Sequence, residues 1–222
     1  MILPEEETGG GKGGNATVLS LGPYPPVVPR RSVRLAARAD ELLPTFAAIR
    51  AEVGVSETFP ADVLAEAEAS SSEPAMPDAD LTDVPFVTLD PPASMDLDQA
   101  FHLDRLPGGG FQLHYAIADV AAFVTPRGAV DAEAHRRVET AYSPDGRAPL
   151  YPLVLSEAAA SLLPDGPRPA IVWRVDIDDA GETVEVDVRR AMVASRGKLS
   201  YAGVQSMLDE GRADEMLALL PE

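Results

Sequence analysis

Three aspartates within nine residues are the side chains in this sequence best suited to chemistry. Asp90, Asp96 and Asp98 follow the apolar run 84–89, and Pro91-Pro92 prevents regular structure just after the first of them. Asp96 and Asp98 are two residues apart, so in extended backbone their side chains point the same way. Two carboxylates held about 4 Å apart repel by about 4 kcal/mol at an effective dielectric of about 20. A divalent cation would turn that repulsion into attraction.

The kind of cation follows from the donor atoms. Oxygen ligands, few of them from protein, are the preference of Mg²⁺, which commonly acts on phosphates. The aspartates therefore predict a Mg²⁺ site, with Mn²⁺ as a substitute, that polarises a phosphoryl oxygen and activates a water. The alternative is a solvated turn rich in Asp and Pro, although the apolar run before Asp90 favours a loop anchored to the core. The glycine run 108–110 lacks the following Lys-Ser or Lys-Thr of a phosphate-binding loop.

Composition narrows the class of protein. The 222 residues include 36 acidic and 18 basic side chains, a net charge of −18, and no cysteine. Without cysteine there is no disulfide, thiolate nucleophile or Cys-ligated metal. The negative charge argues against nucleic-acid binding by general electrostatics, but it leaves room for a nuclease with an acidic metal site. No apolar stretch reaches the roughly 18 residues of a membrane span and the N-terminus is acidic, so we expect a cytoplasmic protein with no membrane partner.

The elements that would position the aspartates begin after a long leader. Residues 1–35 are rich in Gly and Pro and predict a flexible segment. Residues 36–75 predict two helices, at 40–53 and 60–69, which either pack on the next domain or form a small helix-turn-helix. Residues 80–222 contain short β-rich runs separated by turn sequences. They predict strands at 84–89, 100–103, 111–117, 170–177 and 184–193, and helices at 130–140, 200–208 and 214–220. This mixture predicts an α+β fold with a mixed, largely antiparallel sheet and flanking helices.

Ordered sequence blocks around the aspartates carry a family resemblance. The runs 86–90, 96–100 and 115–120 are followed by 130–134, 140–144, 153–156, 161–164, 168–170 and 195–201. In this order they resemble the first part of the RNB catalytic domain of the ribonuclease II and ribonuclease R family, over residues 83–208. The resemblance implies a Mg²⁺-dependent hydrolase that degrades single-stranded RNA from its 3′ end and releases 5′-nucleotides. It implies RNA, and not DNA, as the partner.

The resemblance also implies roles for individual residues. Asp90, Asp96 and Asp98 fall on metal-binding positions, and Asp98 falls on the catalytic carboxylate whose loss is expected to abolish turnover. Tyr142 falls on the aromatic that stacks on the 3′-terminal base, and Tyr201 falls on a tyrosine near the same nucleotide. Stacking tolerates any base, as an enzyme that does not read sequence requires. Taken without the resemblance, each tyrosine is more often a half-buried core or rim residue.

Two departures from the family pattern leave other functions open. Gln99 stands where a fourth aspartate is usual, and the resemblance implies a catalytic domain that is incomplete at the C-terminus, without its later arginine block. A catalytically silent RNA-binding or regulatory relative is therefore an alternative, and a different Mg²⁺-dependent phosphohydrolase is a third. We expect structural or surface roles for His102, His114 and His135, the first two as cross-strand neighbours. The sequence does not indicate an oligomeric state.

Overall fold

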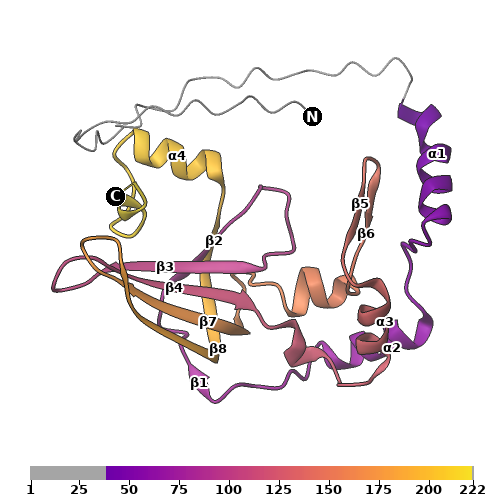
Figure 1. Ribbon diagram of the computed structural model, residues 1–222, viewed down its shortest axis with the longest axis horizontal. Coiled ribbons are helices and arrows are strands. Elements are labelled where there is room, and N and C mark those ends of the chain that lie inside the picture. Colours follow the sequence, from indigo (N-terminus) through magenta and orange to yellow (C-terminus); the bar gives the residue numbers. More distant parts are fainter. Residues whose placement is uncertain (1–38, 222) are drawn as a thin grey trace, which may run out of the picture.

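The computed structural model describes residues 39–221, so the leader predicted for residues 1–35 lies outside the described part (Figure 1). The α-helices are α1 (Ala39–Glu52), α2 (Ala61–Ser70), α3 (Ala129–Arg137) and α4 (Tyr201–Asp209). Shorter helical turns are η1 (Val120–Phe123), the π-helical η2 (Leu155–Ala159) and η3 (Leu217–Leu219). The strands are β1 (Ala79–Asp80), β2 (Phe86–Leu89), β3 (Gln99–Arg105), β4 (Phe111–Ala118), β5 (Ala141–Ser143), β6 (Gly146–Ala148), β7 (Pro167–Ile177) and β8 (Thr183–Leu199).

Five of these strands close into a barrel. They pair in the order β8-β2-β3-β4-β7, and β7 pairs back onto β8. Every contact in the ring is antiparallel except the parallel pairing of β2 with β8. The 17 residues of β8 make closure feasible, because its first part pairs with β7 and its last part with β2. The predicted α+β class with a largely antiparallel sheet is confirmed, and the closure is an addition to it.

Small side chains fill the barrel, as a ring of only five strands requires. Ala100, Ala116, Ala170 and Ala191 are all buried and come from four different strands. Phe86 of β2 and Leu97, just before β3, supply the bulk and are fully buried in the same cluster. Leu97 therefore connects the barrel core directly to the segment that carries the aspartates.

A second core joins the helices to the region beside the barrel. Val63 and Ala67 of α2 pack with Ala122 and Phe123 of η1, Val130 of α3 and Leu155 of η2. Figure 1 shows α2 and α3 side by side at one end of the barrel, with the β5–β6 hairpin rising beside them. The second predicted helix thus packs on the following domain. None of the helices within residues 39–221 is long and apolar enough to cross a membrane.

Most predicted elements are present, with two corrections. The helix predicted at 130–140 ends at Arg137, because Val138 takes a positive φ of 71° that terminates it. The helix predicted at 214–220 is wrong: this segment forms only the short 3₁₀ turn η3, which Asp214 begins by accepting a hydrogen bond from the backbone N–H of Leu217 at 2.8 Å.

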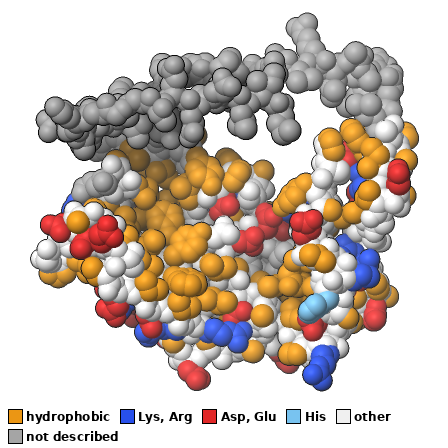
Figure 2. Space-filling view, viewed as in Figure 1, with side chains coloured by type: hydrophobic (Ala, Val, Ile, Leu, Met, Phe, Trp, Pro, Cys, Tyr) orange, Lys and Arg blue, Asp and Glu red, His pale blue; other side chains and the backbone are white. Residues whose placement is uncertain are grey.

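The outer surface of the barrel carries exposed apolar side chains. Tyr115, Trp173 and Val188 are cross-strand partners on β4, β7 and β8, and each is more than a third exposed. Figure 2 shows hydrophobic side chains spread over the barrel, and acidic side chains gathered between the barrel and the β5–β6 hairpin. That acidic region contains the candidate site.

Candidate active site

The loop that carries the three aspartates is fixed through its backbone, although it is neither helix nor strand. Asp90 donates its N–H to the carbonyl of Leu199 at 3.0 Å, and Asp98 accepts from the N–H of Ala118 at 2.9 Å. Between them Leu97 is fully buried and its carbonyl accepts from Leu162. Because neighbouring side chains of extended backbone point in opposite directions, the inward Leu97 directs Asp96 and Asp98 outward.

Two further side chains hold the middle of this loop. Ser161, almost fully buried, accepts a hydrogen bond from the N–H of Leu97 at 3.0 Å and donates its own to the carbonyl of Met95 at 2.7 Å. Lys198, near the end of β8, donates to the carbonyls of Pro92, at 2.8 Å, and Ser94. Lys198 of the barrel strand β8 and Ser161 of the segment before β7 thus both hold the backbone of the loop, which limits how far its carboxylates can move.

The three carboxylates lie within electrostatic reach of one another. Partial burial raises the pKa of Asp98, and the charges of Asp96 and Asp90 raise it further, while Arg147 opposes them. Partial burial also raises the pKa of Asp90, where Lys198 opposes the shift and Asp96 adds to it. Such mutual repulsion is what a bound cation would relieve.

The site fits a divalent cation in the chemistry of its donors but not in their present arrangement. The aspartates offer only oxygen ligands, as Mg²⁺ prefers. Among residues 39–221, however, no three His, Asp or Glu side chains are grouped so that they could hold a metal ion together. Asp96 is instead engaged by an arginine. The predicted roles of Asp90, Asp96 and Asp98 as metal ligands therefore stay predictions.

A cleft of about 310 Å³ lies beside the loop, with the β5–β6 hairpin on its far side. The side chains of both walls that bear on chemistry are Asp96, Asp98, Gln99, Tyr142, Arg147 and Tyr151. Tyr142 is 75% exposed, so its ring is available to a ligand. Asp90 and Tyr201 do not line this cleft, and Tyr201 is the first residue of α4, where it is exposed. The structure thus brings Asp96, Asp98 and Tyr142 together and leaves Tyr201 apart.

Arg147 is the residue of this cleft that sequence reasoning missed. Its guanidinium donates to Oδ2 of Asp96 at 2.6 Å and also bonds to Oε1 of Glu157, on η2. Arg147 and Tyr142 are directly opposed on the hairpin, with paired Cα positions. A sequence signal existed, because Pro144-Asp145-Gly146 is a strong turn sequence and predicts a hairpin that turns Arg147 back toward Tyr142.

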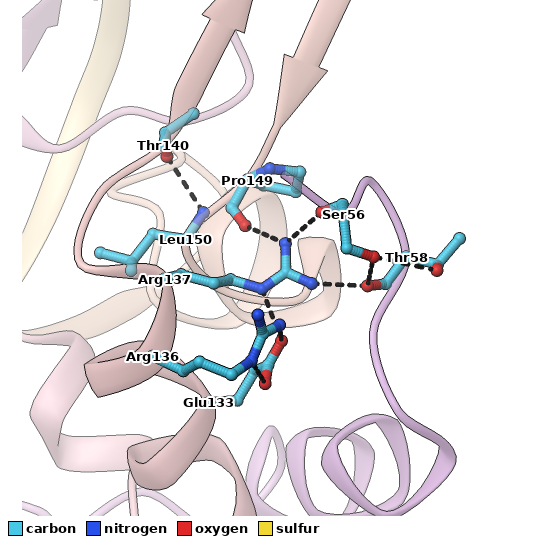
Figure 3. Close-up of polar contacts among 8 residues, drawn as sticks. All are labelled: Ser56, Thr58, Glu133, Arg136, Arg137, Thr140, Pro149 and Leu150. Atoms are coloured by element: carbon cyan, nitrogen blue, oxygen red, sulfur yellow. Dashed lines mark hydrogen bonds and ion pairs between the residues drawn. The ribbon is translucent and has the colours of Figure 1, made fainter. Parts of the chain in front are cut away.

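A buried arginine on α3 fixes the base of that hairpin (Figure 3). Arg137 donates to the carbonyls of Ser56, Thr58 and Pro149 at 2.5 to 3.0 Å, and to Glu133 at 2.7 Å. Its guanidinium also lies 3.8 Å from the centre of the Phe59 ring. This one side chain therefore ties the end of α3 to the segment before α2 and to the strand end that follows Arg147.

The far end of the hairpin has its own support from α1. Arg50 donates to Asp145 at 2.6 Å and to Ser143 at 3.1 Å, both in the hairpin's turn region. The histidines take no part in the cleft. His102 and His114 are cross-strand partners on β3 and β4, as predicted, and His135 lies on α3 beside Asp131.

Comparison with known proteins finds similarity over most of this chain. The model of the RNB domain matches residues 78–219. Exoribonuclease 2 of Proteus mirabilis is 36% identical over 135 residues, which are 60% of this chain and 21% of the relative. A protein named inactive exonuclease DIS3L2, from Arabidopsis thaliana, is 37% identical over 61% of this chain and 13% of its own length.

Among solved structures, Mycoplasma genitalium RNase R in complex with ribose-methylated single-stranded RNA is similar. Its TM-score is 0.70 and its identity 28%, over 80% of this chain and 28% of the RNase R chain. This chain thus spans about a fifth or less of the length of these two curated relatives.

Proposed function

Because the chain belongs to the RNB domain family, we propose that it provides the acidic centre of a Mg²⁺-dependent 3′-to-5′ exoribonuclease. The substrate is single-stranded RNA and the products are 5′-nucleotides. The observation that carries the proposal is the anchored loop of residues 90–98, whose Asp96 and Asp98 face a cleft opposite the exposed Tyr142. The whole activity is a proposal because the chain covers only a small share of the relatives it matches.

Each residue of the cleft then has a defined task. Asp96 and Asp98, with Asp90 in electrostatic reach, would supply the negative charge that holds a divalent cation next to the scissile phosphate. A divalent cation bound there would polarise the phosphoryl oxygen and lower the pKa of the attacking water. Gln99 supplies an amide in place of a fourth carboxylate and can orient a water or a ligand by hydrogen bonding.

Tyr142 is proposed to receive the terminal base. Its ring is largely exposed on a hairpin whose two ends are fixed by Arg137 and Arg50, so little motion is lost when a base stacks on it. Stacking contributes about 1 to 3 kcal/mol per base and does not depend on base identity. Tyr201, which lies outside the cleft, remains a predicted contact to the same end of the RNA.

The test is a 5′-labelled oligoribonucleotide incubated with the chain and Mg²⁺. We expect a ladder of fragments that shortens from the 3′ end, no ladder with Asp98→Asn, and a weakened RNA affinity with Tyr142→Ala. The Asp98→Asn variant should keep the unfolding midpoint of the wild type or raise it, because a carboxylate that is repelled by its neighbours is removed. No shortening by the wild type, or shortening that Asp98→Asn leaves unchanged, refutes the catalytic role.

A second candidate is a catalytically silent RNA-binding protein of the same family. Gln99 in the cleft and the arginine on Asp96 favour it, because both reduce the negative charge available to a cation. This candidate predicts that the chain retains RNA without shortening it. It also predicts that any activity restored by substitution will come from Gln99→Asp, which returns the missing carboxylate.

A further inference from the structure

Arg147, the arginine in the cleft, forms ion pairs with two carboxylates. Arg147 contacts Asp96 through one terminal nitrogen and Glu157 through the other. All three side chains are between 24% and 31% exposed, so water reaches the group and can replace a broken contact. Its net charge is −1, because one guanidinium serves two carboxylates. Asp96 is the member shared with the acidic centre.

This pairing conflicts with the proposed binding of a cation at the same carboxylates. A guanidinium hydrogen-bonded to Oδ2 of Asp96 takes up that oxygen and cancels the charge that would attract a metal. The described residues also contain no assembled group of three ligands. Both observations describe the same arrangement: the guanidinium of Arg147 occupies the carboxylate that a divalent cation would bind.

Arg147 has room to leave Asp96. Its side chain borders the cleft and two further hollows, one of about 550 Å³ that residues of α2 also line and one of about 280 Å³ lined by residues of the loop segment 91–96. A change of rotamer would therefore enter open space rather than packed protein. Glu157 would keep the guanidinium paired during such a move. The opposed Tyr142 places a base-stacking ring on the same hairpin, where an arginine fork suits the phosphate of a stacked nucleotide.

We propose that Arg147 is an exchangeable counter-ion of the acidic centre, which neutralises Asp96 until a divalent cation binds and then pairs with a phosphate of the RNA. The inference rests on the proposed function, since it presumes that a cation and RNA meet in this cleft. It assigns to Glu157 the separate task of keeping the charge of Arg147 balanced in both states.

The first test is Mn²⁺ binding to the full chain by calorimetry. Arg147→Gln removes the competing charge and should bind Mn²⁺ about tenfold more tightly. Glu157→Gln removes one of the two carboxylates that neutralise Arg147, so the guanidinium pairs with Asp96 alone. This variant should bind Mn²⁺ several-fold more weakly than the wild type. Arg189→Gln, which removes an exposed arginine paired with Asp187 on β8 away from the cleft, should leave the affinity unchanged. Opposite shifts support the exchange, and shifts in the same direction or weaker binding by Arg147→Gln overturn it.

The second test asks where Arg147 goes. Binding of a ribose-methylated oligoribonucleotide is measured against salt concentration, with Mn²⁺ and with a chelator. With Mn²⁺, Arg147→Gln should lower the salt slope by about 0.7, the value for one phosphate contact to a single strand. With the chelator, wild type and variant should have equal slopes, because Arg147 is then held by Asp96. A slope difference that is the same under both conditions, or absent under both, overturns the proposed exchange.

These measurements separate failure of the inference from failure of the proposed function. If the wild type shortens RNA but the two charge variants shift together, the exchange is wrong and the function stands. If the wild type binds Mn²⁺ and the two charge variants shift in opposite directions but RNA is not shortened, the exchange stands and the nuclease is wrong. If no variant binds Mn²⁺, the exchange is overturned. Should Arg147→Gln fail to fold, comparison of Glu157→Gln with Arg189→Gln gives the same decision.

Discussion

Replacing Arg137 by Met should destabilise the fold more than any other single charge removal around the hairpin. The side chain is 6% exposed and donates to three backbone carbonyls as well as to Glu133, which is equally buried. Breaking a buried pair by removing one partner costs about 3 to 5 kcal/mol. Met keeps most of the apolar stem, and Glu133 retains Arg136 as a partner. We therefore expect the lower end of that range, about 3 kcal/mol.

The assay is urea unfolding followed by circular dichroism. With a slope of about 2 kcal/mol per molar urea, the midpoint should fall by about 1.5 M at an unchanged slope. Arg136→Met is the matched control, because it removes a guanidinium from the same carboxylate of Glu133 but from an exposed position. The control should shift the midpoint far less. Equal shifts in the two variants would refute the reasoning, since they would mean that the buried carbonyl contacts of Arg137 contribute nothing.

Three further outcomes follow from contacts around the barrel and the loop. Ser161→Ala removes one buried and one partly buried hydrogen bond and should cost about 2 kcal/mol in urea unfolding; a loss below about 0.5 kcal/mol would contradict its anchoring role. Gly110→Ala should lower the thermal midpoint strongly, because φ is +79° and a Cβ would lie 2.1 Å from the carbonyl oxygen of Ile177, whereas Gly108→Ala meets nothing within 4 Å and should be neutral. The hydrogen bond from Arg136 lowers the pKa of Glu133 below its ordinary 4.5, so its stabilisation is complete above pH 4.5 and is lost as the pH falls through the folded value. Urea midpoints measured from pH 7 to pH 3 should show this loss, and Glu133→Gln should flatten it.

The local elements were predictable because their signals are local. The hairpin of β3 and β4 follows from two apolar runs joined by a glycine-rich turn, and β7 and β8 flank the turn at 178–181 in the same way. Closure of the barrel was not predictable from such signals. It depends on the parallel pairing of Phe86 with Ser195 and of Leu89 with Leu199, residues more than 100 positions apart. Nothing in either short run specifies that partner.

In the candidate site, too, the residues with a local sequence signal were predictable and those that act over long sequence distances were not. The carboxylates were found because three aspartates in one short loop are a local pattern, and Tyr142 was found through the order of the family blocks. The side chains that hold them were missed, because Ser161 and Lys198 lie 66 and 106 residues from the loop residues that they contact. Arg147 was missed for a different reason: the turn sequence before it predicts the hairpin, but its partners Asp96 and Glu157 lie on separate segments that the turn does not specify.

Two basic side chains contact the loop that carries the aspartates, Lys198 and Arg147. Their acceptor atoms differ, and this difference decides which of the two contacts a bound cation can replace. Lys198 is one of only two lysines in the chain, and it bonds to backbone carbonyls of the loop. Neutral carbonyls attract an entering divalent cation less strongly than carboxylates do, so we expect Lys198 to stay on the loop when a cation binds. Arg147 bonds to carboxylates, and a carboxylate exchanges one cation for another at little structural cost. In a chain of net charge −18, a lysine that stays in place preserves the loop's shape while an exchangeable arginine leaves its charge available to a ligand.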